Sequence, residues 1–515
     1  MSDQPKSAPR QAVLFLIDTQ GTNCVGCYAG RPELGTPNID RLAAAGMRFD
    51  RAHCAAPVCG PARSAIFTGL YPHSNGVLGN DMAPARDVPT LGERLAQAGI
   101  PAGYIGKWHL DGSDYFGDGR CAPGWDPRYW FDGRNYLESL PDDAARALSR
   151  QVLDAEAVAR HGVTAEFTHA HRTADKARAF IAEHRDRDFF LVVSIDEPHH
   201  PYICPEPFVS AFEDFEHRIG PSSADDLADK PRSQREWRDY QQTLRESKVT
   251  TNAEGEAVLR DPRYFACNSY SDHEVGRVIA AIDEQVPDAL VIYTADHGNM
   301  FFAHGINGKG PAMYDEITRV PLIVRRPGDV AAGGVAASPA SHVDLVPTVL
   351  EFFGIDRPDL LQGTSLWPRL TGGGISGEAK PIFMEFNRFE VDHDGFGSFT
   401  PIRCVTDGRY KLAINLMDTD ELYDLVEDPA EVCNRIDDPA LAAVRDRMHD
   451  LILAWMGETR DPLRCPQWGR RPWRDLGGST WGGTTRPRRF DPEFFPHTLL
   501  YDTAETIDRF TYDKV

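Results

Sequence analysis

Short hydrophobic runs alternate with helical patterns along the first 355 residues of the chain. Val13–Ile17 is a continuous apolar run, as expected of a strand that is buried on both faces of a parallel sheet. Further strand candidates lie at Gly103–Ile105, Phe189–Ser194, Ala289–Thr294 and Val320–Val324. Strands that alternate with helices are typical of an α/β fold, so we predict a large mixed, mostly parallel sheet sandwiched by helices.

Capping residues mark the ends of the predicted helices. Thr36 and Pro37 fit the N-cap and first positions of one helix, and Gly46 follows its end. By the same signals, further helices are predicted over residues 90–98 and 341–353. The charge-rich segment 215–262 has few strand signals, and we interpret it as an insertion of loops and helix.

The pattern changes near residue 375, where shorter, antiparallel-type strands and one amphipathic helix follow. We therefore predict a catalytic domain over residues 1–375 and a smaller C-terminal α+β subdomain over 376–457. Residues 458–515 have no clean periodicity but carry many Trp, Phe and Tyr residues, which disordered tails normally lack. We expect this tail to pack on a folded surface, its own or a neighbouring subunit's, and hence a homo-oligomer.

Charge and cysteine usage restrict the partners and the compartment. The formal net charge of −22 disfavours nucleic acid or an anionic membrane as partner, so an anionic substrate would need a locally positive cleft. No stretch approaches the roughly 20 apolar residues that span a bilayer, and the first apolar run is too short for a signal peptide. The ten cysteines are scattered, and we interpret the CxxC pair Cys24 and Cys27 as buried or partly buried thiols. We therefore expect a reduced, cytoplasmic protein.

Polar side chains follow the ends of four predicted strands; they are Asp18, Lys107, His109, His199, Asp296 and His297. Ligands of open α/β sheets bind outside the carboxyl ends of the strands, so we expect these side chains to converge. Asp18, Asp296 and His297 offer two carboxylates and an imidazole, which suit a divalent cation. The positive surroundings of a tetrahedral dianion would come from Arg63, Lys107, His109, His199 and Lys309.

Cys59 opens a predicted helix that runs to Gly69, within the segment Cys-Gly-Pro-Ala-Arg. A helix N-terminus stabilises an anion through its dipole and its free N–H groups. On this pattern alone, Cys59 is either a buried thiol or a nucleophile of low pKa. The spacing Cys-x-Pro-x-Arg is also the signature that the formylglycine-generating enzyme recognises in sulfatases.

With this motif the chain resembles the type I sulfatases of the alkaline phosphatase superfamily. The similarity runs in order over residues 11–425. It includes Leu-Ile-Asp ending at Asp18, Thr-Pro-Asn-Ile-Asp-Arg-Leu from Thr36, Gly-Lys-Trp-His from Gly106, Pro-His-His-Pro from Pro198, Asp-His-Gly from Asp296, and Gly-Lys-Gly around Lys309. The resemblance implies an alkaline phosphatase-like sheet and hydrolysis of a sulfate monoester of a small molecule.

The resemblance also implies the roles of the site residues. Asp18, Asp296, His297 and Cys59, converted to formylglycine by its generating enzyme, would bind one divalent metal ion. Arg63 would hold the formylglycine hydrate, and the sulfate would contact Lys107, His109, His199 and Lys309. One hydroxyl of the hydrate would attack sulfur, and the second would allow sulfate to leave.

Two positions depart from the family pattern. Many members carry a second Asp where this chain has Thr19, and the usual Asp-Asn pair is Asp-His at position 297. We expect Ca²⁺, with Mn²⁺ as the alternative because an imidazole replaces an oxygen ligand. The alternatives in function are a phosphonate monoester or phosphodiester hydrolase on the same scaffold, and a binding protein without activity. The aromatic residues Trp108, Tyr115, Trp125, Trp130 and Phe131 are candidates for the core or for the site entrance.

Overall fold

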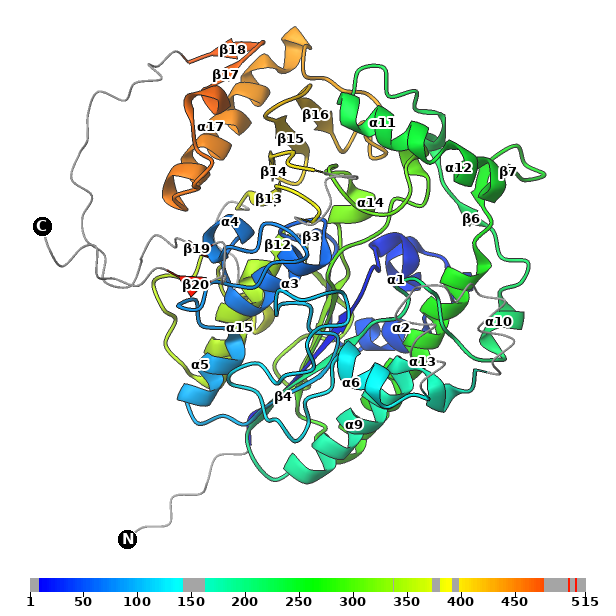
Figure 1. Cartoon of the computed structure of the whole chain (residues 1–515), viewed down its shortest axis with the longest axis vertical. Coiled ribbons are helices and arrows are strands. Elements are labelled where there is room, and N and C mark those ends of the chain that lie inside the picture. The colour runs from blue at the N-terminus through cyan, green and yellow to red at the C-terminus, as the bar shows by residue number, and fades with distance from the viewer. Residues whose placement is uncertain are drawn as a thin grey trace, which may run out of the picture.

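The computed structural model describes residues 9–141, 163–336, 338–372, 380–390 and 398–476, together with the short strands β19 (Leu499–Leu500) and β20 (Glu505–Thr506). A seven-stranded sheet forms the centre of the larger part (Figure 1). Its strand order is β11 (Gly334–Ala336), β2 (Met47–Phe49), β10 (Leu322–Arg325), β9 (Leu290–Ala295), β1 (Gln11–Ile17), β5 (Phe189–Ile195) and β4 (Ala102–Gly106).

Strand β1 lies inside this sheet, and all seven of its residues are buried. It pairs in parallel with β5 and β9, and β4 pairs in parallel with β5. Strand β10 runs antiparallel to both of its neighbours. The sheet is therefore mixed and mostly parallel, which confirms the predicted fold class. All five predicted strands are present, with ends that differ by at most two residues.

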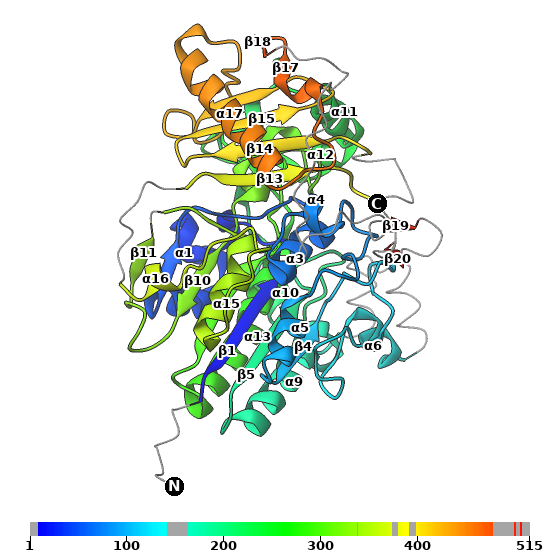
Figure 2. The same ribbon diagram turned by 90° about the vertical axis from the view of Figure 1, so that its left-hand side faces the viewer.

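Helices cover both faces of the sheet. Helices α2 (Pro37–Ala44), α9 (His169–His184) and α13 (Pro262–Gln285) pack together on one side, while α3 (Cys59–Thr68), α5 (Leu91–Gln97) and α15 (Leu345–Phe353) group on the other (Figures 1 and 2). Their apolar faces join the sheet in one large core. Because these helices lie on the two faces, they do not cover the carboxyl ends of the parallel strands.

The N-terminus of α2 is capped in a different way from the prediction. Thr36 occupies the N-cap position, but its hydroxyl makes no capping hydrogen bond within the helix. The buried carboxylate of Asp272, from α13, instead accepts the backbone N–H groups of Asn38 and Ile39. Because this contact spans more than 230 positions of the chain, a local capping rule cannot find it.

A second, four-stranded sheet forms the C-terminal part, in the order β13 (Ile382–Phe386), β14 (Ile402–Thr406), β15 (Tyr410–Asn415) and β16 (Glu421–Asp424). All of its strand pairs are antiparallel, and α17 (Ala442–Glu458) packs on β14 and β15 (Figure 2). The sheet and helix confirm the predicted C-terminal α+β part. The proposed boundaries at 375 and 457 stay predictions.

The charged insertion differs from its prediction. Helices α11 (Arg232–Tyr240) and α12 (Gln242–Lys248) are present as expected. The same region also holds a three-stranded antiparallel sheet of β6 (His217–Arg218), β8 (Ala257–Leu259) and β7 (Val249–Thr251). The prediction of loops and helix was wrong here, because strands of two or three residues are too short to set an alternating pattern.

Of the aromatic tail, the structure describes residues 458–476 and the backbone of the short strands β19 and β20. There Trp468 is fully buried and packs in the core between α17 and the second sheet. The later aromatic residues of the tail, from Trp481 to Tyr512, lie outside the described side chains. Packing on a neighbouring subunit, and with it a homo-oligomer, stays a prediction.

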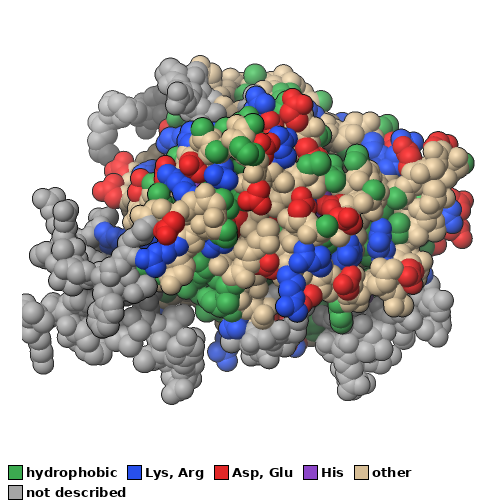
Figure 3. Space-filling view, turned by 90° about the horizontal axis from the view of Figure 1, so that it is seen from above, with side chains coloured by type: hydrophobic (Ala, Val, Ile, Leu, Met, Phe, Trp, Pro, Cys, Tyr) green, Lys and Arg blue, Asp and Glu red, His purple; other side chains and the backbone are tan. Residues whose placement is uncertain are grey.

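Helix hydropathy and surface charge can be examined directly in the structure. Among the described residues, no helix combines the length and apolar character needed to cross a membrane. Figure 3 shows Lys and Arg side chains interspersed with Asp and Glu on the face seen from above. The net charge of −22 therefore does not gather into one acidic field on that face.

Candidate active site

The predicted site residues meet at the carboxyl ends of the parallel strands of the central sheet. Asp18 directly follows β1 and Asp296 directly follows β9. Backbone hydrogen bonds hold both in register, because Asp18 donates to Ile195 O at 3.1 Å and Asp296 donates to Ile17 O at 3.2 Å. The two carboxylates are therefore placed by the sheet itself, and both are fully buried.

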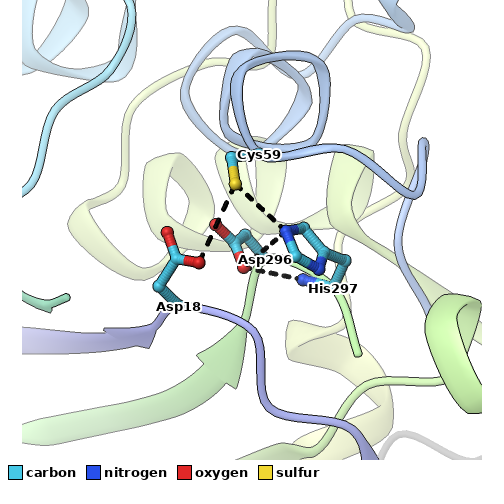
Figure 4. Close-up of side chains that lie close together, drawn as sticks. All are labelled: Asp18, Cys59, Asp296 and His297. Atoms are coloured by element: carbon cyan, nitrogen blue, oxygen red, sulfur yellow. Dashed lines mark hydrogen bonds and ion pairs between the residues drawn. The ribbon is translucent and has the colours of Figure 1, made fainter. Parts of the chain in front are cut away.

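Helix α3 brings Cys59 to the same point (Figure 4). The Cys59 Sγ lies 3.1 Å from His297 Nε2 and 3.8 Å from Asp18 Oδ1. One potential ligand atom from each of Asp18, Cys59, Asp296 and His297 lies within 4.8 Å of the others. We call these four residues the nucleophile cluster, and their donor set of oxygen, nitrogen and sulfur could hold a metal ion.

His297 presents a defined nitrogen to the cluster. Its Nδ1 lies 2.8 Å from the carbonyl oxygen of Gly298, so the ring is assigned as the tautomer that donates there. In this tautomer Nε2 carries a lone pair, and Nε2 is the atom that faces Cys59. A backbone carbonyl that orients a histidine in this way is common behind metal ligands.

The positive charges of Arg63 and Lys107 neutralise the carboxylates of Asp18 and Asp296. The guanidinium of Arg63 donates to Asp296 Oδ2 at 2.9 Å and to Asp18 Oδ2 at 3.1 Å. Lys107 Nζ lies 2.7 Å from Asp18 Oδ2 and 3.2 Å from Asp196 Oδ1. Because the contacts to Asp18 and Asp296 use only their Oδ2 atoms, each keeps its Oδ1 on the side of the nucleophile cluster.

Three further side chains, those of Lys309, His199 and His109, lie close to these residues. Lys309 Nζ lies 2.6 Å from Cys59 Sγ, 3.2 Å from His297 Nε2 and 3.4 Å from His199 Nε2. His109 is buried with φ of 57°, and its ring stands 5.7 Å from that of Tyr115. All the predicted catalytic and metal residues therefore lie together.

The electrostatics of the cluster follow from burial against nearby cations. Burial raises the pKa of Asp18, but Lys107, His199, Lys309 and Arg63 lower it by more, so this pKa lies well below its usual value. Burial and Asp18 raise the pKa of the Cys59 thiol to about 11, although Lys309 and Lys107 oppose them. Unmodified Cys59 is therefore a protonated thiol at neutral pH, which argues against the alternative of a nucleophile of low pKa.

Thr19 explains what replaces the second Asp of the family pattern. Its backbone N–H donates to Asp296 Oδ1 at 3.0 Å, and its hydroxyl donates to Asp18 Oδ1 at 2.6 Å. To make both contacts, Thr19 adopts a left-handed conformation with φ of 60°. Thr19 thus orients both carboxylates.

Sequence reasoning missed two polar residues of the site, Ser194 and Asp196. The Ser194 hydroxyl accepts from Arg63 at 2.9 Å, and the carboxylate of Asp196 pairs with Lys107. Asp196 directly follows β5, so the rule applied to the other strand ends also predicts it. Ser194 lies within β5, where a serine is indistinguishable from an ordinary buried strand residue.

A pocket opens beside the cluster, and Lys107 and His199 form part of its wall. Of the five aromatic candidates, Tyr115 lines this pocket, and its ring centroid lies 3.8 Å from Lys107 Nζ. The other four are buried in the main core, where three tryptophans pack around Tyr104. The core interpretation is therefore correct for these four, whereas Tyr115 lines the pocket, and its place at the entrance stays a prediction.

An α/β sheet with this donor set at one edge fits the alkaline phosphatase superfamily, and comparisons with known proteins define the family within it. Residues 10–355 match the family model described as Sulfatase, and residues 304–457 match that of N-sulphoglucosamine sulphohydrolase, C-terminal. The chain is 42% identical over 499 residues to the uncharacterized sulfatase YidJ of Escherichia coli K12, which covers 96% of this chain and 97% of that relative. It is 27% identical over 503 residues to an N-acetylglucosamine-6-O-sulfatase of Bacteroides thetaiotaomicron, covering 84% and 83%.

Solved structures share the fold. BT4656, in complex with its substrate D-glucosamine-2-N,6-O-disulfate, matches with a TM-score of 0.71 at 20% identity over 88% of this chain and 99% of that one. A phosphonate monoester hydrolase of Agrobacterium radiobacter matches with a TM-score of 0.68 at 23% identity, over 88% and 96%. The chain belongs to the sulfatase family. It is a hydrolase of sulfate esters, as the motifs predicted.

Proposed function

We propose that the chain hydrolyses a small-molecule sulfate monoester through a formylglycine made from Cys59, beside one divalent metal ion. The observation that carries the proposal is the nucleophile cluster, in which a thiol at a helix start meets two carboxylates and an oriented imidazole within 4.8 Å. A formylglycine hydrate would supply one hydroxyl that attacks sulfur and displaces the protonated alcohol oxygen. Deprotonation of the second hydroxyl would then break the C–O bond to sulfate, which releases sulfate and restores the aldehyde. The thiol itself, with a pKa raised to about 11, is a poor substitute.

The charges at the site support a bound cation. Arg63, Lys107 and Lys309 carry three positive charges, and three carboxylates balance them: Asp18, Asp296 and Asp196. A divalent cation held by Asp18, Asp296, His297 and the modified Cys59 would make the site positive, as a sulfate anion requires. When bound, it would lower the pKa of a hydroxyl and neutralise sulfate oxygens. We propose Ca²⁺, with Mn²⁺ as the alternative because His297 adds a nitrogen ligand.

The remaining residues divide between holding charge and moving a proton. Arg63, fully buried, would fix the carboxylates and the hydrate, while Lys107 and His109 would contact sulfate oxygens. Burial and Lys107 lower the pKa of His199 to about 3, so this imidazole is neutral at pH 7. We therefore assign the proton for the leaving oxygen to Lys309, whose Nζ lies 3.4 Å from His199 Nε2.

Two measurements test the mechanism directly. Mass spectrometry of the peptide that contains residue 59 should find the lower mass of an aldehyde, in protein made together with the formylglycine-generating enzyme. Only protein with that mass should release sulfate from 4-nitrophenyl sulfate. Equal turnover by protein that retains the thiol would reject the role of formylglycine.

A phosphonate monoester or phosphodiester hydrolase is the second candidate. The shared fold of the Agrobacterium radiobacter enzyme supports it as a related scaffold, and the cations around Cys59 suit any tetrahedral anion. Comparing kcat/KM for an aryl sulfate and an aryl phosphonate separates the two activities. A higher kcat/KM for the phosphonate would favour the second candidate.

Compartment and assembly are further proposals. All ten cysteines are free, which supports the reduced environment of the cytoplasm. Cell fractionation tests this, and light scattering of the purified protein tests the homo-oligomer expected from the aromatic tail.

A further inference from the structure

The pocket beside the nucleophile cluster is lined by polar side chains beyond those of the cluster. Its wall near the cluster is made by Lys107 and His199, and its lining also includes Glu197 and His169. Apolar residues such as Tyr136 and Ile203 also line it. An ester whose sulfate contacts Lys107 would therefore place its alcohol part in the same pocket as Glu197 and His169.

Glu197 and His169 are buried, and three of their four polar side-chain atoms have no hydrogen-bond partner. Each side chain is about 6% exposed. One oxygen of Glu197 accepts the backbone N–H of Ala170 at 3.1 Å, which fixes the carboxylate at the start of α9. Its other oxygen, Oε2, has no hydrogen-bond partner, and neither nitrogen of His169 has one. Leaving such groups unpaired in a protein interior costs free energy, so this pair is typical of a site that a polar ligand completes.

The geometry of the pair selects the kind of ligand group. Glu197 Oε2 and His169 Nδ1 are 3.8 Å apart, which is too far for a hydrogen bond between them. A single hydroxyl oxygen placed about 2.8 Å from each atom fits between them. It would donate its proton to the carboxylate and accept from the imidazole N–H. The His169 ring is held for this contact, because it stacks on Phe131 and meets Tyr136 edge-on.

We propose that Glu197 and His169 form a recognition point for a free hydroxyl group on the alcohol part of the sulfate ester. The two residues determine specificity, and they select esters of hydroxyl-bearing alcohols over otherwise identical esters that lack the hydroxyl. The inference rests on the proposed function, because it takes the sulfate to lie at Cys59 and Lys107. A second anionic group placed beside this pair would face the Glu197 carboxylate and is disfavoured.

The test uses D-glucose 6-sulfate and its deoxy analogues, each of which lacks one of the other hydroxyls. For the mature enzyme, we expect kcat/KM to fall by about 10- to 100-fold for one analogue, since hydrogen bonds to charged groups are worth this much. Glu197→Gln replaces the free acceptor oxygen by a donor of the same shape. In this variant the ratio of kcat/KM for D-glucose 6-sulfate to kcat/KM for that analogue should fall to near one. The matched control is Glu183→Gln, an exposed carboxylate at the far end of α9, which should keep the wild-type ratio.

Binding keeps the inference separable from the proposed function. Calorimetry with Cys59→Ala measures the affinity for the same esters without turnover, and His169→Phe provides a second variant that keeps the ring stacking. Discrimination that is lost in both pocket variants supports the recognition point even if no ester is hydrolysed, in which case the proposed function alone fails. Equal rates and equal affinities across the deoxy series, with 4-nitrophenyl sulfate still hydrolysed, would overturn the inference and leave the pair a site for water only.

Discussion

Among the residues that the structure describes, two arginines are fully buried, and they have different roles. Arg403, in the second sheet, donates to both carboxylate oxygens of Asp461, at 2.6 and 3.2 Å. Arg63, at the nucleophile cluster, donates to one oxygen of Asp18 and one oxygen of Asp296. Arg403 thus forms a bidentate pair with a single carboxylate. Arg63 instead divides its bonds between two carboxylates and leaves the other oxygen of each beside Cys59.

The difference shows how the same burial can build a core or a site. In a bidentate pair both partners are satisfied within the chain. Removing one partner leaves the other charge buried without compensation and costs stability. At the nucleophile cluster, Thr19 donates to the Oδ1 atoms of Asp18 and Asp296, so hydrogen bonds to both oxygens hold each carboxylate facing the candidate metal site. We expect changes around Arg403 to alter folding and changes around Arg63 to alter chemistry, and four predictions test this contrast.

The largest effect is expected at Cys59. Cys59→Ala should reduce kcat for 4-nitrophenyl sulfate by about 10⁴-fold or more, because the nucleophile is removed. Cys59→Ser should be nearly as inactive, since the maturation enzyme cannot convert it. Thermal unfolding should change little in both variants, because a small substitution at a helix start leaves the core intact. Retained turnover in either variant would reject the mechanism.

Removal of the metal ion should have the next largest effect. Dialysis against EDTA should lower kcat by about 10³-fold, as expected when charge stabilisation worth several kcal/mol is lost. Ca²⁺ or Mn²⁺ should restore activity, and the better ion identifies the metal. The ion should also raise the unfolding free energy, by about 2.7 kcal/mol at a concentration of 100 times its Kd. Arg403→Met should show the same metal-dependent increase as the wild type; a missing increase in that variant would contradict the separation of the two regions.

Arg403→Met tests the bidentate pair itself. The variant leaves the carboxylate of Asp461 buried without its partner, so we expect it to lose about 3–5 kcal/mol of unfolding free energy. Urea denaturation measures this loss, and kcat per folded molecule should stay at the wild-type value. The surface pair of Arg128 with Glu183 provides the control, because Arg128→Met should leave the unfolding free energy nearly unchanged when the lost pair is exposed to solvent. A large loss of kcat in folded Arg403→Met would show that the second sheet supports the chemistry.

The contrast also shows what could be predicted from the sequence. The continuous apolar run of β1 and the residues that follow the strands identified the sheet and most of its site, since parallel strands bring their carboxyl ends together. Asp196 was accessible to the same reasoning but was missed, and Ser194 was not accessible because it lies inside a strand. The unpaired atoms of Glu197 and His169 depend on distances between a strand end and a helix start, which no local pattern contains.

The smallest effect is expected at Tyr115, at the border between the nucleophile cluster and the pocket. Its hydroxyl contacts the Asp196 carboxylate and lies 2.9 Å from His199 Nδ1, so it joins the lysine-bound carboxylate to the imidazole that faces Lys309. Tyr115→Phe keeps the ring beside Lys107 but removes this link. His200 O, also 2.9 Å from His199 Nδ1, still holds the imidazole, so we expect kcat to fall only about tenfold, with a smaller change in KM.

Tyr129→Phe is the matched control for this prediction, because its hydroxyl contacts Glu183 on the outer surface and touches no residue of the site. We therefore expect Tyr129→Phe to keep the wild-type kcat, as measured by steady-state kinetics with 4-nitrophenyl sulfate. If Tyr115→Phe also kept the wild-type kcat, His200 alone would orient His199. The active site would then depend on the backbone at this point, much as it does where Gly298 holds His297.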